Sequence, residues 1–129
     1  MVIDTSALIA ILHQEPEATR FAQLIEEADS LLVSPITLLE AGIIVHCRKG
    51  PDGTTELDAL LDAIKPEIVA FDEEQALIAR QAFERFGKGQ HRAALNFGDC
   101  AVYALAATRA EPLLFKGDDF GQTDVSVVG

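Results

Sequence analysis

Short apolar runs alternate with longer helical stretches along the chain, and this alternation limits the folds that the chain can adopt. The short runs are continuously apolar, without the strict alternation of apolar and polar residues that marks a half-exposed strand. Such runs are typical of parallel strands that are buried on both faces between two layers of helices. We therefore expect an α/β fold with strands at residues 1–3, 31–33, 68–71, 113–115 and 125–128.

The stretches between these runs have the periodicity and the start signals of helices. Ser34 followed by Pro35 is an N-cap residue with proline at the first helical position. The polar, glycine- and proline-rich residues 49–55 predict a turn between two helices. The predicted helices cover residues 5–12, 16–28, 36–48, 56–64, 73–86 and 97–109.

Length and charge narrow the classes of protein to consider. A chain of 129 residues that is 49% hydrophobic is long enough for its own core, so we expect a single domain over residues 1–129. The sequence has neither a membrane-spanning apolar run nor the basic segment of a secretory signal, so we expect a cytoplasmic protein without membrane contact. The net charge of −11 argues against a general nucleic-acid coat protein, whose affinity would come from basic surface. It fits a basic partner protein or an acidic pocket that holds a cation.

Acidic residues stand directly after two of the predicted strands. Open parallel sheets bind ligands beyond the carboxyl ends of their strands. Asp4 follows the first predicted strand, and Asp118 and Asp119 follow the fourth. Taken alone, Asp4 is most economically a helix cap, and a Gly-Asp-Asp sequence is ordinary in a turn. A capping oxygen leaves the second carboxylate oxygen available, so Asp4 can be both a cap and a ligand.

Two further acids are the only charges in otherwise apolar helices. Glu40 is the lone charge in SPITLLEAGIIV, where we expect it to share an apolar helix face with Ile36 and Ile43. Asp99 is the lone charge in LNFGDCAVYALAA, and its position three residues after Asn96 predicts a capping box. A carboxylate on an apolar face is costly unless it is paired or bound. A distant Lys or Arg could pair with Glu40, although only 10 basic residues serve 21 acidic ones.

Taken together, these acids predict a site for a divalent cation. Clustered carboxylates repel one another and raise one another's pKa, and a bound cation removes this repulsion. A set of oxygen ligands without His or Cys suits Mg²⁺ or Mn²⁺ rather than zinc. Three or four acids of this kind are what metal-assisted hydrolysis of a phosphodiester requires.

Four segments in a fixed order carry a resemblance to a known family: MVIDTSAL, LLEAG, ALNFGDCAVYALA and PLLFKGDDF. Together they resemble the PIN-domain ribonucleases, and most of all the VapC toxins of bacterial type II toxin–antitoxin pairs. The resemblance covers essentially the whole chain. It implies a three-layer PIN-like fold, with a central parallel sheet of about five strands and helices on both faces. It also implies Mg²⁺-dependent cleavage of RNA, neutralisation by a cognate VapB-like antitoxin, and a homodimer.

The resemblance assigns a role to each acid. Asp4, Glu40 and Asp99 match the first three acids of the family. Asp119 precedes Phe120, as the fourth acid of the family precedes an aromatic residue. Asp4 and Asp99 would then bind the metal, whereas Glu40 and Asp119 would bind a second ion or act through water.

The last of the four segments departs from the family pattern. Many relatives have Asp or Asn where Gly117 stands, so Asp118 is an alternative to Asp119 as the fourth acid. The neighbouring Lys116 could neutralise this acid or hold a phosphate, and the sequence does not separate these roles. The residues expected to support the acids are Thr5, Ser6, Asn96 and Lys116.

Residues 80–92 form the only basic patch of this acidic chain, and they lead toward Asp99. Such a patch can bind RNA phosphates, and the alternative is a solvated helix end in which basic residues favour the helix dipole. The candidate RNA contacts are Arg85, Lys88 and Arg92.

Two other classes of protein also begin with a strand that ends in Asp. Phosphatases of the haloacid-dehalogenase type have a second Asp two residues later, where this chain has Ser6. A phosphoacceptor receiver domain needs an Asp at the end of a central strand, whereas Asp52 lies in the predicted turn. A non-catalytic interaction module remains open if the acidic pocket binds no metal.

Overall fold

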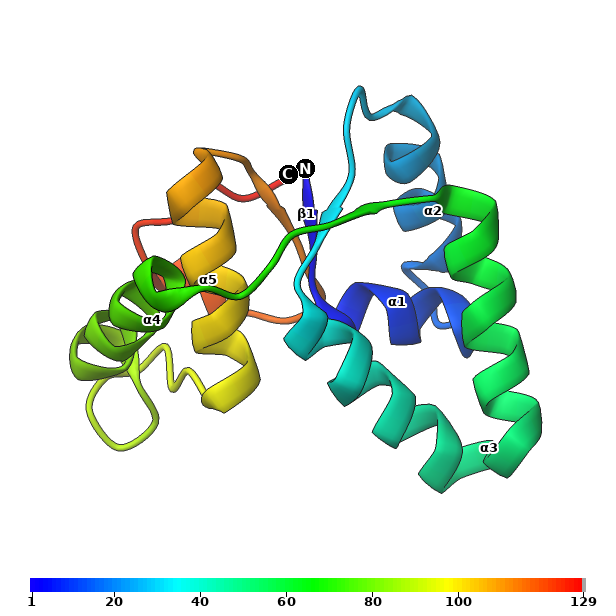
Figure 1. Ribbon diagram of the computed structural model, residues 1–129, viewed down its shortest axis with the longest axis horizontal. Coiled ribbons are helices and arrows are strands. Elements are labelled where there is room, and N and C mark those ends of the chain that lie inside the picture. The colour runs from blue at the N-terminus through cyan, green and yellow to red at the C-terminus, as the bar shows by residue number, and fades with distance from the viewer. Residues whose placement is uncertain (129) are drawn as a thin grey trace.

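Four short parallel strands form the centre of the computed structural model, which describes residues 1–128 (Figure 1). The strands are β1 (Val2–Ile3), β2 (Leu32–Val33), β3 (Glu67–Ile68) and β4 (Leu113–Leu114), in the order β3-β2-β1-β4. Both residues of β1, β2 and β4 are buried, as expected, whereas β3 is exposed at the edge of the sheet. Gly129, the last residue of the predicted domain, lies outside the described residues.

The prediction of about five strands is wrong for the described residues, because residues 125–128 form a single bridge instead of a strand. Leu113 N donates to Ser126 O over 2.9 Å, and Val128 N donates to Leu113 O over 3.0 Å. The backbone carbonyl of Leu114 accepts a hydrogen bond from Asp4 N, on the β1 side of the strand. Because β4 has only two residues, Leu113 alone can pair with a fifth segment.

Helices cover both faces of the sheet, which confirms the expected three-layer α/β architecture. Figure 1 shows α4 and α5 on one side of β1, and α1, α2 and α3 on the other. The helices are α1 (Thr5–Leu12), α2 (Ala18–Glu27), α3 (Pro35–Ile64), α4 (Glu73–Phe86), α5 (Phe97–Arg109) and the short 3₁₀ helix η1 (Phe120–Gln122). Within residues 1–128, no helix has the length and apolar character that crossing a membrane requires.

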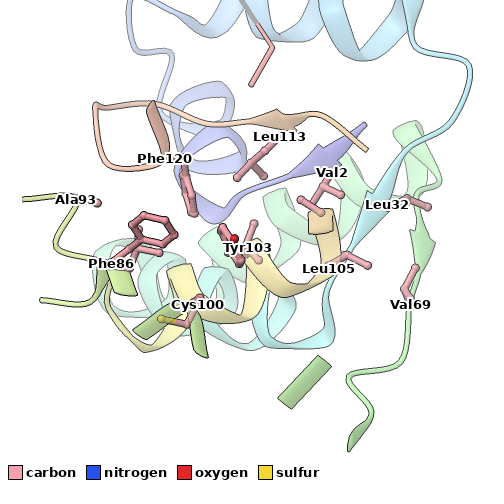
Figure 2. Packing of buried hydrophobic residues seen from close by; sticks show 14 residues of the cluster. Val2, Leu32, Val69, Phe86, Ala93, Cys100, Tyr103, Leu105, Leu113 and Phe120 are labelled. Atoms are coloured by element: carbon pink, nitrogen blue, oxygen red, sulfur yellow. The ribbon is translucent and has the colours of Figure 1, made fainter. Parts of the chain in front are cut away.

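The sheet divides the hydrophobic core into two clusters, because successive strand residues point to opposite faces. Val2 and Leu113 belong to the cluster on the α5 side (Figure 2), whereas Ile3 and Leu114 belong to the cluster on the α1 side. Helix α5 is buried at every position from 100 to 106, since it lies between the sheet and α4. The beginning of α5, which carries Asp99, is therefore held by a long buried stem.

The turn predicted between two helices at residues 49–55 is reduced to a kink at Gly50, where the two halves of α3 (Pro35–Ile64) meet. Only Gly50 leaves the helical conformation, with φ 59° and ψ −144°, and the helix resumes at Pro51. Proline suits the first position of a helix because it lacks an N–H group and its φ is already helical. One residue is thus enough to bend the helix, and Figure 1 shows the two halves meeting at this sharp bend.

We expect Gly50→Ala to lower the free energy of unfolding by about 1–3 kcal/mol, because its backbone conformation is nearly restricted to glycine. Gly42→Ala is the matched control in the same helix, where an added Cβ meets no atom within 4 Å. This second change should raise the free energy of unfolding by about 0.5–1 kcal/mol, since alanine favours helix. Urea unfolding followed by circular dichroism measures both values. Effects of the same sign would contradict the assignment of the bend to Gly50.

Candidate active site

The order of the strands creates a switch point between β1 and β4. The chain runs from β1 to β2 and β3 on one side, and β4 then pairs with the other side of β1. Open α/β sheets bind ligands beyond the carboxyl ends of their strands at such a point. Asp4 lies there, because its N–H donates to Leu114 O over 3.0 Å. The structure thus has Asp4 at the end of the first strand, as expected.

The two oxygens of the Asp4 carboxylate have different surroundings. Oδ2 caps α1 by accepting hydrogen bonds from Ser6 N over 3.0 Å and from Ser6 Oγ over 2.5 Å. Oδ1 is buried without a hydrogen-bond partner in the described structure, and the residue is only 5% exposed. A buried carboxylate oxygen without a partner is costly and indicates a ligand or an ion that would bind it. The cap and the ligand role are therefore divided between two atoms.

Ser6 joins the start of α1 to the segment after β4. Its hydroxyl accepts a hydrogen bond from Lys116 N over 2.9 Å while it donates to Asp4. The neighbouring Thr5 is buried, and its Oγ1 atom has no hydrogen-bond partner among the described residues. Both small polar residues that were expected to support Asp4 thus lie beside it.

The side chain of Lys116 does not reach the acids. Its Nζ atom lies 2.6 Å from Glu15 Oε1 and 3.0 Å from Glu17 Oε2, in the link between α1 and α2. The structure therefore does not support the expectation that this ammonium group neutralises Asp119 or holds a phosphate. Lys116 contributes to the site through its backbone N–H alone.

Glu40 reaches the same region from α3, which begins at the end of β2 with Ser34 as its N-cap. Its carboxylate lies directly over Gly98, where an added Cβ would stand 2.5 Å from Oε2. The expected apolar face is wrong: the buried stripe of α3 runs through Thr37 and Ala41, and Ile43 is 56% exposed. Glu40 is half-buried at the boundary between these two faces.

Asp99 is fixed at the beginning of α5 by the predicted capping box. Asn96 Oδ1 accepts from Asp99 N over 2.9 Å, and Asp99 Oδ2 accepts from Asn96 N over 3.0 Å. These two hydrogen bonds hold the carboxylate close to the helix backbone. The expected supporting role of Asn96 toward Asp99 therefore has a direct geometric basis.

Electrostatic effects connect Asp99 with three other carboxylates. Burial, together with the charges of Asp4, Asp119 and Glu40, raises the pKa of Asp99 to about 7. Burial also raises the pKa of Asp4, and the charge of Glu40 adds to this effect. Asp118 is not among the principal charges that act on Asp99. Of these two neighbouring acids, Asp119 is thus the one whose charge acts on Asp99.

Gly117 accounts for the departure of this chain from the family pattern before these two acids. Its φ of 113° lies in the region that favours glycine, so the chain turns sharply between β4 and Asp119. An Asp or Asn at this position would have to adopt that strained conformation. The two acids of this segment, Asp118 and Asp119, both follow the turn.

The four acids fit a hard divalent cation in their chemistry. The oxygen-only ligand set, the unpartnered Asp4 Oδ1 and the mutual repulsion all favour binding of Mg²⁺ or Mn²⁺. Among residues 1–128, however, no three His, Cys, Asp or Glu side chains are close enough to hold an ion as they stand. An ion would therefore be held by fewer of these side chains, or by carboxylates that rotate toward it.

The predicted RNA contacts separate into two groups. Arg85 has two partners within the protein. Its Nη2 atom lies 3.0 Å from Asp124 Oδ2, and its guanidinium lies 4.6 Å from the centre of the Phe86 ring. Lys88 and Arg92 are exposed on the loop that leads into α5. All three residues stay candidates for RNA contact, since the side chain of Arg85 is itself 57% exposed.

Three residues with a structural part in this region were not found by sequence reasoning. Gly98 lets the Glu40 carboxylate approach α5, and its only sequence signal is its place directly before Asp99. Thr37 is buried one helical turn before Glu40, with Oγ1 unpartnered in the described structure. Asp124 binds Arg85, and its sequence neighbourhood carries no signal of that contact.

Comparisons with known proteins agree with this geometry. The model of the PIN domain family matches residues 1–126. Ribonuclease VapC30 of Mycobacterium tuberculosis is 46% identical over 128 residues, which cover 99% of this chain and 98% of that protein. The family match and this relative both extend over nearly the whole chain.

Two solved structures share the fold. VapC20 of Mycobacterium tuberculosis, a sarcin–ricin loop cleaving toxin, superposes with a TM-score of 0.77 at 16% identity, over 98% of this chain and 97% of its own. A toxin–antitoxin complex from Klebsiella pneumoniae contains a chain with a TM-score of 0.72 at 17% identity, over 98% of this chain and 95% of that one. At these identities the structures show likeness of fold alone. The family match and the whole-length similarity to VapC30 show that this chain belongs to the PIN-domain family, with VapC ribonucleases as its relatives.

Proposed function

We propose that this protein is a divalent-metal-dependent endoribonuclease and the toxin of a toxin–antitoxin pair. The observation that carries the proposal is the buried, unpartnered Asp4 Oδ1 at the switch point, within electrostatic range of Glu40 and Asp99, with Asp119 also acting on Asp99. The names of the relatives support the choice of RNA as substrate, since they are ribonucleases. A cytoplasmic location follows from this substrate and stays a prediction.

Asp4 and Asp99 would hold the metal ion, and Glu40 and Asp119 would hold a second ion or orient water. A bound Mg²⁺ or Mn²⁺ would supply positive charge for the scissile phosphate and an activated water molecule. Ser6 keeps Asp4 Oδ2 in its capping position, which leaves Oδ1 as the oxygen without a partner that an ion could bind. The beginning of α5 adds the positive end of a helix dipole beside Asp99, which favours binding of a phosphate group.

The partners follow from charge and exposed apolar surface. A chain with net charge −11 attracts a basic segment, and such a segment of an antitoxin could enter the acidic pocket and block it. The solved toxin–antitoxin complex with the same fold supports this partner. Leu39 and Ile43 on α3 and Phe97 on α5 are 62%, 56% and 82% exposed, next to Glu40 and Asp99. A homodimer would cover these apolar side chains.

The rival functions have weaker support. Ser6 occupies the position of the second acid of a haloacid-dehalogenase phosphatase and binds Asp4 instead. Asp52 is exposed in α3, so it cannot be the strand-end phosphoacceptor of a receiver domain. A non-catalytic interaction module would keep the fold but would neither bind a divalent cation nor cut RNA.

We expect purified protein, free of antitoxin, to cut structured RNA in the presence of Mg²⁺ or Mn²⁺. Addition of EDTA should abolish this cleavage. Asp4→Asn and Asp99→Asn should lower cleavage by at least about a hundredfold, because even outer partners of metal ligands are worth about 10–100-fold. Gel analysis of labelled RNA measures the rates. Cleavage that persists in EDTA, or that survives both substitutions, would contradict the metal-site mechanism.

Stability separates this loss of activity from misfolding. The pKa of Asp99 is raised to about 7, so the folded state disfavours the ionised form, and Asp99 lowers stability as the pH rises from its ordinary pKa toward 8. Asparagine keeps the oxygen that accepts from Asn96 N and removes the charge. Without metal at pH 8, the Asp99→Asn variant should therefore melt at a higher temperature than wild type. A lower melting temperature would show that the substitution damages the fold.

Gly98→Ala should impair cleavage without unfolding the protein. The added Cβ would displace the Glu40 carboxylate, whose Oε2 atom would otherwise lie 2.5 Å away. Because the displaced atoms are the end of a flexible side chain, the melting temperature should change little, while the cleavage rate should fall about tenfold or more. Gly42→Ala is the control, since its Cβ meets no atom within 4 Å. Equal rates for the two variants would argue against a role for Glu40.

Expression in a bacterial host tests the toxin role. We expect wild-type protein to arrest growth, and co-expression of its cognate antitoxin to restore growth. The Asp99→Asn variant should not arrest growth at the same protein level, because the charged site is needed for cleavage. Equal arrest by wild type and by this variant would show that the toxicity arises elsewhere.

A further inference from the structure

The segment that carries Asp119 is anchored in the core at one end. Asp119 lies outside any α-helix, directly before the 3₁₀ helix η1. The next residue, Phe120, is 2% exposed and meets the edge of Phe115 with ring centres 5.1 Å apart. Figure 2 shows Phe120 within the same buried cluster as Phe86 and Tyr103. This anchor fixes the backbone beside Asp119.

A chain of local hydrogen bonds continues from Asp119 to Asp124. Gln122 N donates to Asp119 O over 3.2 Å, and Thr123 donates to Phe120 O through both its N–H (3.1 Å) and its hydroxyl (2.7 Å). Val125 N in turn donates to Thr123 Oγ1 over 3.3 Å. These hydrogen bonds join the backbone from Asp119 to Val125 into one turn, which connects Asp119 to Asp124.

The far end of this turn is held by a second anchor, which we call the Asp124 clamp: Asp124, Tyr103 and Arg85. Tyr103 Oη donates to Asp124 Oδ1 over 2.5 Å, and Arg85 Nη2 donates to Asp124 Oδ2 over 3.0 Å. The ring of Phe86 supports both donors, with the Arg85 guanidinium 4.6 Å and the Tyr103 ring 5.9 Å from its centre. The clamp thus attaches the turn to α4 and α5 together.

Tyr103 and Asp99 lie four residues apart on α5, one helical turn from each other. Helix α5 therefore carries one acid of the site directly and fixes the turn that carries another. Burial, together with the hydrogen bond to Asp124, raises the pKa of Tyr103 to about 12, so its hydroxyl remains a donor at any working pH. The hydrogen bond from Tyr103 also keeps the pKa of Asp124 below its ordinary value, so Asp124 remains a charged acceptor.

We propose that Asp124 is a positioning residue of the acidic site, which through Tyr103 and Arg85 sets the place of Asp119 relative to Asp99. This inference rests on the proposed function of the four acids. It gives Arg85, expected from the sequence to bind RNA, a different part as one arm of the clamp.

The clamp contributes more to geometry than to stability. The side chains of Arg85 and Asp124 are 57% and 53% exposed, and ion pairs at this exposure add little to the free energy of folding. Metal affinity depends more strongly on the position of the ligands. Loss of a residue that orients a metal ligand typically lowers metal affinity or activity by about 10–100-fold. Loss of the clamp should therefore weaken the site while the protein stays folded.

The test compares Asp124→Ala and Tyr103→Phe with the control Glu67→Gln. Glu67 forms an ion pair of similar exposure with Arg109 of α5, also at 3.0 Å, away from the proposed site. Calorimetry with Mn²⁺ alone, the melting temperature, and the Mn²⁺ dependence of RNA cleavage are measured for each. Asp124→Ala should weaken Mn²⁺ binding about tenfold, Tyr103→Phe should act in the same direction but less, and Glu67→Gln should match wild type. Tyr103→Phe keeps the buried ring, so it reports on the clamp even if Asp124→Ala unfolds.

A double-mutant cycle then asks whether the clamp acts through Asp119. Asp124→Ala added to Asp119→Asn should cause no further loss of Mn²⁺ affinity, because the residue that it positions is already changed. Losses that simply add, or wild-type affinity in both clamp variants, would overturn this inference alone. Wild-type protein that binds no Mn²⁺ would overturn the proposed function, and with it the inference.

Discussion

The burial of the Asp4 carboxylate is the constraint on which the rest of the site depends. A carboxylate this deeply buried is costly, and the hydrogen bonds from Ser6 offset only the cost of Oδ2. The strand order makes the position unavoidable, because Asp4 N completes the pairing of β1 with β4. The fold therefore has a destabilised oxygen at its switch point, and the neighbouring acids increase the repulsion there. Such a conflict between stability and charge is typical of a functional site.

Main-chain geometry decides where the other acids stand. Asp4 is the N-cap of α1, and Asp99 is the third residue of α5 in a capping box, so ordinary capping hydrogen bonds orient both carboxylates. The position of Glu40 depends instead on the absence of a side chain at Gly98. This absence leaves room for the Glu40 carboxylate of α3 against the beginning of α5. The site is thus assembled mostly from features that any helix start provides, and their combination at one end of the sheet makes it specific.

The sequence predicted the features whose causes are local. The helices at 5–12, 73–86 and 97–109 match the structure because Asp4, Asp72 and Asn96 cap them. The strands are shorter than the apolar runs, and β3 (Glu67–Ile68) shares only Ile68 with the strand predicted at residues 68–71. The face of Glu40, the partners of Lys116 and the partner of Arg85 depend on contacts between distant segments, and a pattern along one chain carries no information about them.

The four acids also differ in what holds them, and this difference explains the form of the C-terminal segment. Three are held at the beginning of α-helices: Asp4 caps α1 after β1, Glu40 stands on α3 after β2, and Asp99 stands in the first turn of α5. Asp119 stands on a turn, two residues after a glycine with a φ of 113°, and no α-helix or strand of the scaffold carries it. Its place must therefore come from side chains, and Phe120 in the core and Asp124 between α4 and α5 supply the two fixed points. An acid outside the regular scaffold needs such anchors more than the acids within it do.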